Sequence, residues 1–243
     1  MRGIILCGGT GSRLYPLTKC INKHLLPVGG KPMAQWNIEK LVEAGINDIL
    51  IISGKEHCGS IIQQFGDGSE FNCKLTYKVQ EKAGGIAEAI ALAEDFAHNE
   101  SICVILGDNL FSMKLTHILS YKHEALIFIK EVSDPERFGV AEFYQKLSQY
   151  GNDVTVTSIE EKPRHPKSSY AVTGIYIYPP DVFKKIKQLT PSARGELEVT
   201  DLNNLYLNEH KLCARKMNDN DWWTDAGTFE SYYKANKLIK GEN

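Results

Sequence analysis

The stretch ILCGGTGSRLYP (residues 5–16) changes abruptly from apolar residues to glycines, hydroxyls and one arginine. The apolar residues from Gly3 to Cys7 predict a buried first strand. Main-chain N–H groups of a glycine-rich turn after such a strand can surround an anion, and Arg13 can bind the same anion. Lys23 follows closely enough to reach it. The stretch predicts a phosphate-binding loop, with an ordinary glycine turn bearing a surface arginine and lysine as the alternative.

Two familiar kinds of phosphate loop do not fit this sequence. A Walker loop requires Gly-Lys-Ser/Thr four residues after its first glycine, and no such run follows the first strand. A dinucleotide-binding loop runs directly into a helix, but Leu14 stands where its third glycine belongs, and Pro16 would disrupt the helix. The loop is therefore expected to stay extended for longer than a dinucleotide loop does.

Outward from the loop, short β-rich runs alternate with helical periodicity. Alternating strands and helices favour a mostly parallel sheet covered on both faces, with ligands bound beyond the carboxyl ends of the strands. The loops after Leu6, Val79 and Leu106 should therefore surround one crevice. The expected strands span 3–7, 48–53, 74–80 and 102–109, and the expected helices span 31–46, 59–65 and 85–97.

The second half of the chain predicts strands with no long helices between them. This pattern favours an antiparallel or mixed extension of the same sheet. We expect one domain over residues 1–243, with a boundary near Asp134 as the alternative. The expected strands here span 125–132, 139–144, 156–163 and 172–179, and the helices span 181–189, 198–209 and 228–239.

Composition excludes several classes of protein. The net charge of −2 over 243 residues gives no electrostatic case for nucleic acid as a partner. We expect no secretory signal and no membrane span, because no apolar run is long enough for either. The six cysteines form no CxxC pair. They are expected to be reduced thiols of a cytoplasmic protein, with no zinc site.

Several motifs resemble, in order, those of the sugar nucleotidyltransferase family. The resemblance covers essentially the whole chain and implies a Rossmann-like α/β fold of the nucleotide-diphospho-sugar transferase type. It also implies that residues 1–133 mainly bind nucleotide, and that residues 134–243 supply the sugar-binding part and the C-terminal helices. The motifs are GGTGSRLYPLT (8–18), KHLLP (23–27), KPM (31–33), LGDN (106–109), DPERFGV (134–140), EEKP (160–163), YAVTGIYIY (170–178), ARGELEVTD (193–201) and WTDAG (223–227).

The closest resemblance is to members that convert dTTP and α-D-glucose 1-phosphate into dTDP-glucose and pyrophosphate, with Mg²⁺ as cofactor. The attacking group is then a phosphate oxygen, already anionic at pH 7 because a phosphate monoester has a second pKa near ~6. Catalysis therefore reduces to positioning and charge neutralisation. UTP in place of dTTP is the alternative within the class. A non-catalytic sensor of sugar nucleotides is the alternative outside it.

The resemblance implies a role for each matching residue. It makes Arg13, Lys23 and Asp108 catalytic, with Asp108 also contacting the nucleotide. It assigns Mg²⁺ to Asp108 and Asp225. The other nucleotide-binding residues are Leu6, Gly8, Gly9, Thr10, Gly11, Ser12, Gln80 and Gly85, and the sugar-phosphate-binding residues are Asn109, Gly139, Glu161, Lys162, Val172 and Arg194. For Arg194 a surface salt bridge is an equal alternative.

Some positions depart from the family pattern or leave it undecided. QEKAGGIAEA (80–89) stands where many members have QPSPDGLAQA, so Glu81, Lys82 and Glu88 leave the base preference open. The pair Trp222 and Trp223 is expected to form a buried or interface cluster, with sugar stacking as the alternative. The resemblance also implies a homo-oligomer, a tetramer or dimer. We expect the regulatory nucleotide site of longer members to be absent or reduced.

Overall fold

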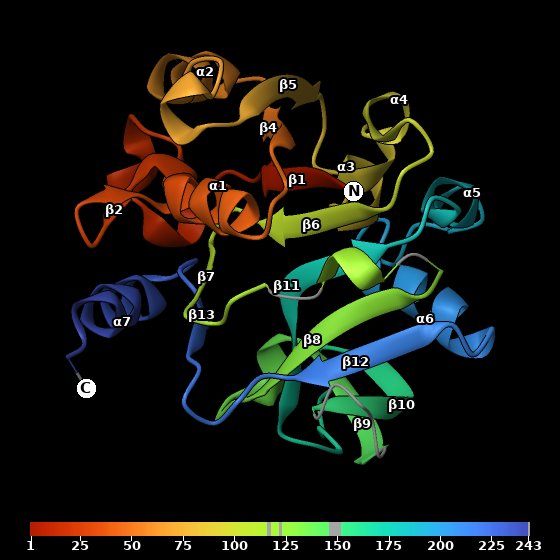
Figure 1. Cartoon of the computed structure of the whole chain (residues 1–243). Helices are drawn as coiled ribbons and strands as arrows, with labels where there is room; N and C mark the ends of the chain where they lie inside the picture. Colours follow the sequence, from red (N-terminus) through yellow and green to blue (C-terminus); the bar gives the residue numbers. More distant parts are fainter. Residues whose placement is uncertain (116–117, 122, 146–151, 243) are drawn as a thin grey trace.

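The computed structural model describes residues 1–115, 118–121, 123–145 and 152–242. They form a nine-stranded sheet with helices on both faces and two small two-stranded ribbons (Figure 1). The sheet order is β5 (Lys74–Gln80), β4 (Asp48–Gly54), β1 (Arg2–Cys7), β6 (Ile102–Leu106), β11 (Tyr170–Tyr178), β8 (Ala125–Glu131), β12 (Leu212–Lys216), β10 (Asp153–Glu161) and β9 (Gly139–Gln145).

The strand directions divide the sheet into two parts. Strands β5, β4, β1 and β6 are mutually parallel, as the alternating pattern of the first half predicts. Beyond them β11 is antiparallel to both β6 and β8, and β10 is antiparallel to β12 and β9. The sheet is therefore parallel in its first half and mixed in its second, which confirms the expected α/β fold with a mixed extension.

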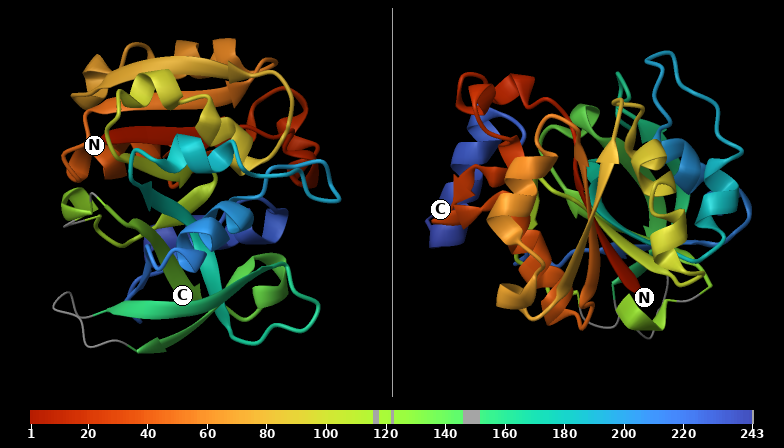
Figure 2. Two further views of the ribbon diagram at one scale, coloured as in Figure 1. Left: turned by 90° about the vertical axis from the view of Figure 1, so that its right-hand side faces the viewer. Right: turned by 90° about the horizontal axis from the view of Figure 1, so that it is seen from above.

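Helices cover both faces because the strands are buried on both sides. Along β1, Ile4 and Leu6 pack into one core cluster with α3 and α6, whereas Ile5 and Cys7 pack into the other with α1 and α2. The two views in Figure 2 show these layers. The helices are α1 (Met33–Glu43), α2 (Cys58–Phe65), α3 (Ile86–Ala91), α4 (Glu94–Ala97), α5 (Val182–Ile186), α6 (Val199–Asn208) and α7 (Phe229–Lys240).

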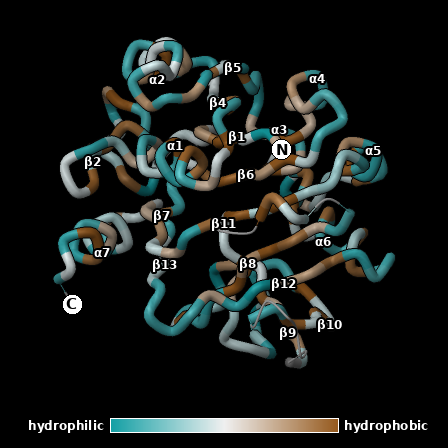
Figure 3. Tube along the Cα trace, viewed as in Figure 1, coloured by the Kyte–Doolittle hydropathy of each residue, from teal (hydrophilic) through white to brown (hydrophobic). Residues whose placement is uncertain are grey.

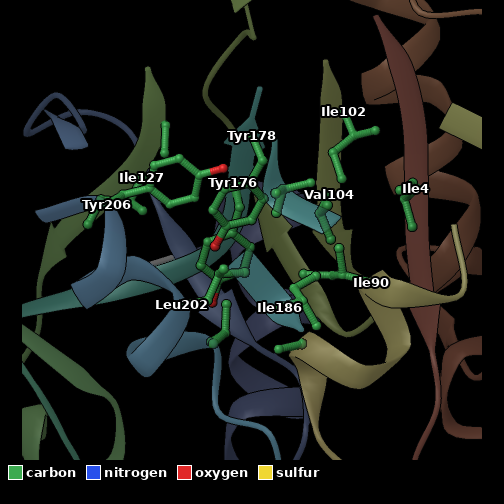
Figure 4. Close-up of a cluster of buried hydrophobic side chains, with 14 of the residues drawn as sticks. Ile4, Ile90, Ile102, Val104, Ile127, Tyr176, Tyr178, Ile186, Leu202 and Tyr206 are labelled. Atoms are coloured by element: carbon green, nitrogen blue, oxygen red, sulfur yellow. The ribbon is translucent and has the colours of Figure 1, made fainter. Parts of the chain in front are cut away.

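Buried aromatic rings pack where the two parts of the sheet meet. Tyr178 of β11 and Tyr206 of α6 stack with ring centroids 5.7 Å apart (Figure 4). The Tyr178 hydroxyl donates to Asn203 Oδ1 (2.6 Å). Figure 3 shows the apolar residues concentrated along central strands such as β6, β8 and β11. No helix among the described residues is long and apolar enough to cross a membrane.

Three features differ from the sequence-based expectations. The helix expected over 85–97 is divided into α3 and α4 by a turn at Leu92 and Ala93, where the Leu92 carbonyl accepts a hydrogen bond from Lys78 Nζ (2.9 Å). Strand β12 was not predicted. The polar tip after β6 continues into a short strand, β7 (Asn109–Phe111), which pairs with β13 (Trp223–Asp225). The second ribbon joins β2 (Pro27–Val28) to β3 (Lys31–Pro32).

Candidate active site

The glycine loop leaves the carboxyl end of β1 and does not enter an α-helix. Gly11 adopts φ +64 and begins the 3₁₀ turn η1 (Ser12–Leu14), and Thr18 Oγ1 donates to the Gly11 carbonyl at 2.8 Å. Only short 3₁₀ turns and the β2–β3 ribbon precede α1 at Met33. The loop is thus longer than a dinucleotide loop, as Leu14 and Pro16 predict, and it leaves Arg13 exposed at the edge of the sheet.

Lys23 and Asp108 form the most buried ion pair near this loop. Lys23 Nζ lies 2.5 Å from Asp108 Oδ2, and each side chain is 13% exposed. Burial by itself would raise the pKa of Asp108, but the nearby Lys23 ammonium holds that pKa well below its usual range. Asp108 is therefore an obligate anion, presented beyond the end of β6.

Asn109 holds Asp108 in place. Its Nδ2 donates to Asp108 Oδ1 at 3.0 Å, and its Oδ1 accepts from the Gly174 N–H (2.9 Å) and from Trp223 Nε1 (2.7 Å). A Cβ on Gly174 would lie 2.6 Å from Asn109, so only glycine fits there. The amide predicted to assist sugar-phosphate binding is thus engaged in linking β7, β11 and β13.

Asp225 reaches the same place from the far end of the sequence. In the β7–β13 ribbon it lies opposite Asn109, next to Asp108. Burial and the Asp108 charge raise the pKa of Asp225 to about 6, against the opposing effect of Arg137, whose Nη2 lies 3.3 Å from its carboxylate. Two carboxylates therefore lie close together, and Arg137, Arg13 and Lys23 offset their repulsion only in part.

The sugar-side residues come from three adjacent strands and one helix. Gly139 and Glu161 are opposite each other in the β9–β10 pair, and β11 brings Val172 alongside. Thr200 of α6 donates to Glu161 Oε2 at 2.5 Å. Lys162 has the uncommon φ of +44 that its position after β10 imposes, with its N–H bonded to the Phe138 carbonyl (2.9 Å).

A cavity of about 460 Å³ joins these groups. Eight of the predicted site residues line it, namely Arg13, Asp108, Asn109, Gly139, Glu161, Lys162, Val172 and Asp225. The other predicted residues lie beyond its lining: Leu6, Gly8, Gly9, Thr10, Gly11, Ser12, Lys23, Gln80, Gly85 and Arg194. Of these, Gln80 lies beside the glycine loop, since a Cβ on Gly8 would lie 3.2 Å from its Oε1.

Arg194 forms a surface salt bridge. It is about half exposed, and its Nη2 lies 2.9 Å from both carboxylate oxygens of Glu198 and 3.7 Å from Glu161 and Glu196. Three carboxylates thus surround its charge. The geometry favours the second of the two interpretations of this residue, whereas Lys162, which pairs with Glu161 (3.3 Å), lines the cavity.

Several lining residues were not assigned to the site from the sequence. Arg137 and Thr200 lie in motifs quoted above, so their membership of a motif was the available signal. Trp223 is buried with its ring edge-to-face on Phe138 (5.2 Å), as expected for a buried cluster, and it also lines the cavity. The remaining unpredicted lining residues are Ile86, Leu106, Phe138, Gly174, Tyr176 and Val199.

The two aspartates suit a small divalent cation. A Cβ on Gly227 would lie 3.6 Å from Asp108 Oδ2, 3.7 Å from Asp225 Oδ2 and 3.1 Å from Arg13 Nη2, so both carboxylate oxygens border one small space together with the Arg13 guanidinium. Magnesium is held by one or two carboxylates together with substrate phosphates and water. No cluster of three or more His, Cys, Asp or Glu side chains suited to a metal occurs in the described ranges, and the six cysteines there are free thiols.

Comparisons with known proteins agree with this architecture. The nucleotidyl transferase family profile matches residues 2–242. The glucose-1-phosphate thymidylyltransferase of Neisseria meningitidis is 42% identical over 245 residues, which cover 99% of this chain and 83% of that protein. The protein of the same name from Mycobacterium tuberculosis is 37% identical over 247 residues, with 99% and 82% covered.

Solved structures share the fold. A crystal structure assigned as a Bacillus anthracis glucose-1-phosphate thymidylyltransferase, in complex with sucrose, is 52% identical with a TM-score of 0.90, covering 100% of this chain and 96% of that one. A UDP-glucose pyrophosphorylase complexed with UDP-glucose is 25% identical with a TM-score of 0.85, covering 99% and 98%. With the family profile matched along nearly its whole length, the chain is an enzyme that belongs to the nucleotidyl transferase family.

Proposed function

We propose that this enzyme transfers a dTMP unit from dTTP to α-D-glucose 1-phosphate, producing dTDP-glucose and pyrophosphate. The observation that carries the proposal is the cavity that places Arg13, Lys162 and the two aspartates together beside the glycine loop. The relatives named for this activity, 37–42% identical over nearly the whole chain, support the choice of substrates.

The chemistry requires no proton to be removed. An oxygen of the sugar phosphate attacks the α-phosphorus, and the bond from that phosphorus to the bridging oxygen of pyrophosphate breaks. Because the sugar phosphate is already anionic at pH 7, the enzyme must bring two anions together and neutralise their charge. Cations, main-chain amides and carboxylates suit this work better than an activated serine or cysteine.

Each residue then has a distinct task. Arg13 binds the triphosphate, and Lys23 contacts the α-phosphate from its place beside Asp108. Lys162 holds the sugar phosphate, and Glu161, oriented by Thr200, accepts hydrogen bonds from sugar hydroxyls. The glycine loop supplies main-chain N–H groups to the triphosphate, and Gln80 with Gly85 contacts the base.

Asp108 and Asp225 fit a bound Mg²⁺, because their oxygens border the same small space. When bound, the cation neutralises phosphate charge and holds the triphosphate in line with the attacking oxygen. The pKa of Asp225 is raised in part by the neighbouring Asp108 charge. A bound divalent cation would offset that repulsion and favour the ionised form of both carboxyls.

UTP is the second candidate nucleotide. The fold is also that of a UDP-glucose pyrophosphorylase at a TM-score of 0.85, and thymine differs from uracil by one methyl group, which a pocket discriminates only weakly. Membership of an enzyme family argues against the distant alternative, a sensor without catalysis. It has no need for the full set of cations and carboxylates that borders the cavity.

One assay tests all of these alternatives. Pyrophosphate release is measured with glucose 1-phosphate and each of dTTP, UTP, CTP, ATP and GTP, with and without Mg²⁺. We expect strong release with dTTP that depends on both the sugar phosphate and the metal. Release with UTP alone would show that UTP is the nucleotide substrate, and the proposed type of reaction would stand. No release with any nucleotide would favour another sugar phosphate or the sensor.

A further inference from the structure

Glu88, in the first turn of α3, contacts the side chain that is assigned to the base. Its Oε2 accepts a hydrogen bond from Gln80 Nε2 at 2.7 Å and another from the Gly84 N–H at 3.0 Å. A Cβ on Gly84 would lie 2.2 Å from this oxygen, so the carboxylate packs directly against a residue that has no side chain. Glu88 is thus held firmly by the turn that joins β5 to α3.

A carboxylate accepts hydrogen bonds and cannot donate them, so it determines which way the Gln80 amide points. The NH₂ group must face Glu88. The same Nε2 also lies 3.4 Å from the Gly85 carbonyl, so both of its hydrogens have acceptors within the protein. Gln80 is left with only its carbonyl oxygen to offer, and that oxygen lies on the side of Gly8, in the glycine loop.

We infer that Glu88 is a positioning residue that presents Gln80 to the nucleobase purely as a hydrogen-bond acceptor, and so selects pyrimidines that carry N3–H. Thymine and uracil have that N–H. Cytosine has a lone pair at N3, which would face the lone pairs of Gln80 Oε1. The inference rests on the proposed function, in which Gln80 contacts the base.

A second group beside Glu88 completes a two-point contact. The main-chain N–H of Gly85 has no acceptor among the residues that the structure describes, so it is free to donate to a base carbonyl. An acceptor at Gln80 and a donor at Gly85 match the adjacent N–H and C=O groups of thymine and uracil. The backbone donor is fixed by the fold, but the acceptor depends on Glu88.

The test compares catalytic efficiency, kcat/KM, with dTTP and with CTP for four single variants and one double variant. Glu88→Ala frees the Gln80 amide to rotate, and the dTTP:CTP ratio should fall by about tenfold or more, mainly through KM. Glu88→Gln keeps an oxygen that can accept both hydrogen bonds, so its ratio should stay within about threefold of the wild type. Glu81→Gln, a charge removal at an exposed neighbour, is the matched control.

The fourth variant, Gln80→Ala, tests the assignment of Gln80 to the base separately from the role inferred for Glu88. If Glu88 acts only through Gln80, the double variant Gln80→Ala/Glu88→Ala should show no lower ratio than Gln80→Ala alone. Binding of dTDP and CDP, followed by calorimetry, should show the same selectivity without turnover.

Three outcomes would count against these assignments. An unchanged ratio in Glu88→Ala, or an equal fall in Glu88→Gln, overturns the inference about Glu88. An unchanged ratio in Gln80→Ala overturns the assignment of Gln80 to the base. Absence of pyrophosphate release from the wild type with every nucleotide instead contradicts the proposed function.

Discussion

Asp108 and Asp225 border the same small space beside Gly227, yet the pKa values of their carboxyls are displaced in opposite directions. Asp108 has the Lys23 ammonium 2.5 Å away, whereas Asp225 is buried next to the Asp108 charge, which Arg137 at 3.3 Å and the more distant Arg13 offset only in part. The fold therefore stabilises the ionised form of Asp108 and destabilises the ionised form of Asp225. Their substitutions should have opposite effects on stability.

Asp225→Asn should stabilise the metal-free protein at pH 7 while removing most turnover. A carboxyl whose pKa is raised to about 6 stabilises the fold below its unfolded value of 3.8 and loses that contribution as the pH rises through 6. At pH 7 the ionised group is a cost of about 3 kcal/mol, or roughly 6–12 °C in Tm. Thermal unfolding in chelator checks this. Asp108→Asn is the comparison, and should lower Tm because Lys23 loses its partner.

His24 should make the protein sensitive to acid. It is buried, it contacts Asn22 at 2.7 Å, and burial lowers its pKa from 6.5 to about 3. The unfolded chain takes up the proton near pH 6.5 and the folded chain only near 3, so this contribution to stability is full above 6.5 and declines as the pH falls. Between pH 7 and 5 the wild type should lose about 2 kcal/mol more than His24→Gln, measured by denaturant unfolding. Parallel losses in the two proteins would contradict the assignment.

Lys162 and Arg194 should differ sharply as sugar-phosphate ligands. Lys162 lines the cavity, whereas three carboxylates surround the Arg194 charge. We expect Lys162→Ala to lower kcat/KM for glucose 1-phosphate by roughly 10²–10³, and Arg194→Ala to lower it by less than about fivefold. Steady-state kinetics with saturating dTTP measure both. An Arg194→Ala loss as large as that of Lys162→Ala would restore Arg194 to the phosphate site.

Gly85→Ala should impair the binding of both substrates. Gly85 adopts φ +101, and a Cβ there would lie 2.5 Å from the Leu197 carbonyl, in the segment that leads into α6 and Thr200. Displacing this segment should raise KM for dTTP and for glucose 1-phosphate together, by roughly tenfold each. Gly195→Ala is the control, since Gly195 also has positive φ (+74) but a Cβ there would meet open space. Equal KM values in the two variants would argue against the contact with Leu197.

The local patterns predicted most of the fold. Alternate burial of Ile4 and Ile5 on opposite faces follows from strand geometry alone, and the periodicity from Pro32 to Gly45 located α1 to within a few residues. Strand β12 was missed because Leu212 to Lys216 carry little apolar alternation, and their pairing with β8 supplies the stability instead. The turn between α3 and α4 bonds to Lys78 of β5, a contact that the local pattern does not contain.

In the candidate site, too, some residues could be identified from the local sequence and others only from the folded structure. Arg13, Asp108 and Lys162 could be identified from the sequence because each lies in a motif near the end of a strand, and the motifs follow the order found in the family. The role of Asn109 in bonding Gly174 and Trp223, and that of Arg137 beside Asp225, depend on side chains brought together across 65 residues or more. The engagement of the Gln80 amide by Glu88 likewise appears only once β5 and α3 are packed.

The β7–β13 ribbon has a consequence for how the enzyme is made. It joins Asn109 to Asp225, so the carboxylate pair exists only after the last strand has docked on a segment made much earlier. A nascent or refolding chain that has organised only the parallel half would have its glycine loop and Asp108 in place, but neither Lys162 nor Asp225. Long-range closure of this kind is slow, so catalytic activity should return in the final phase of refolding, after most helical signal has recovered.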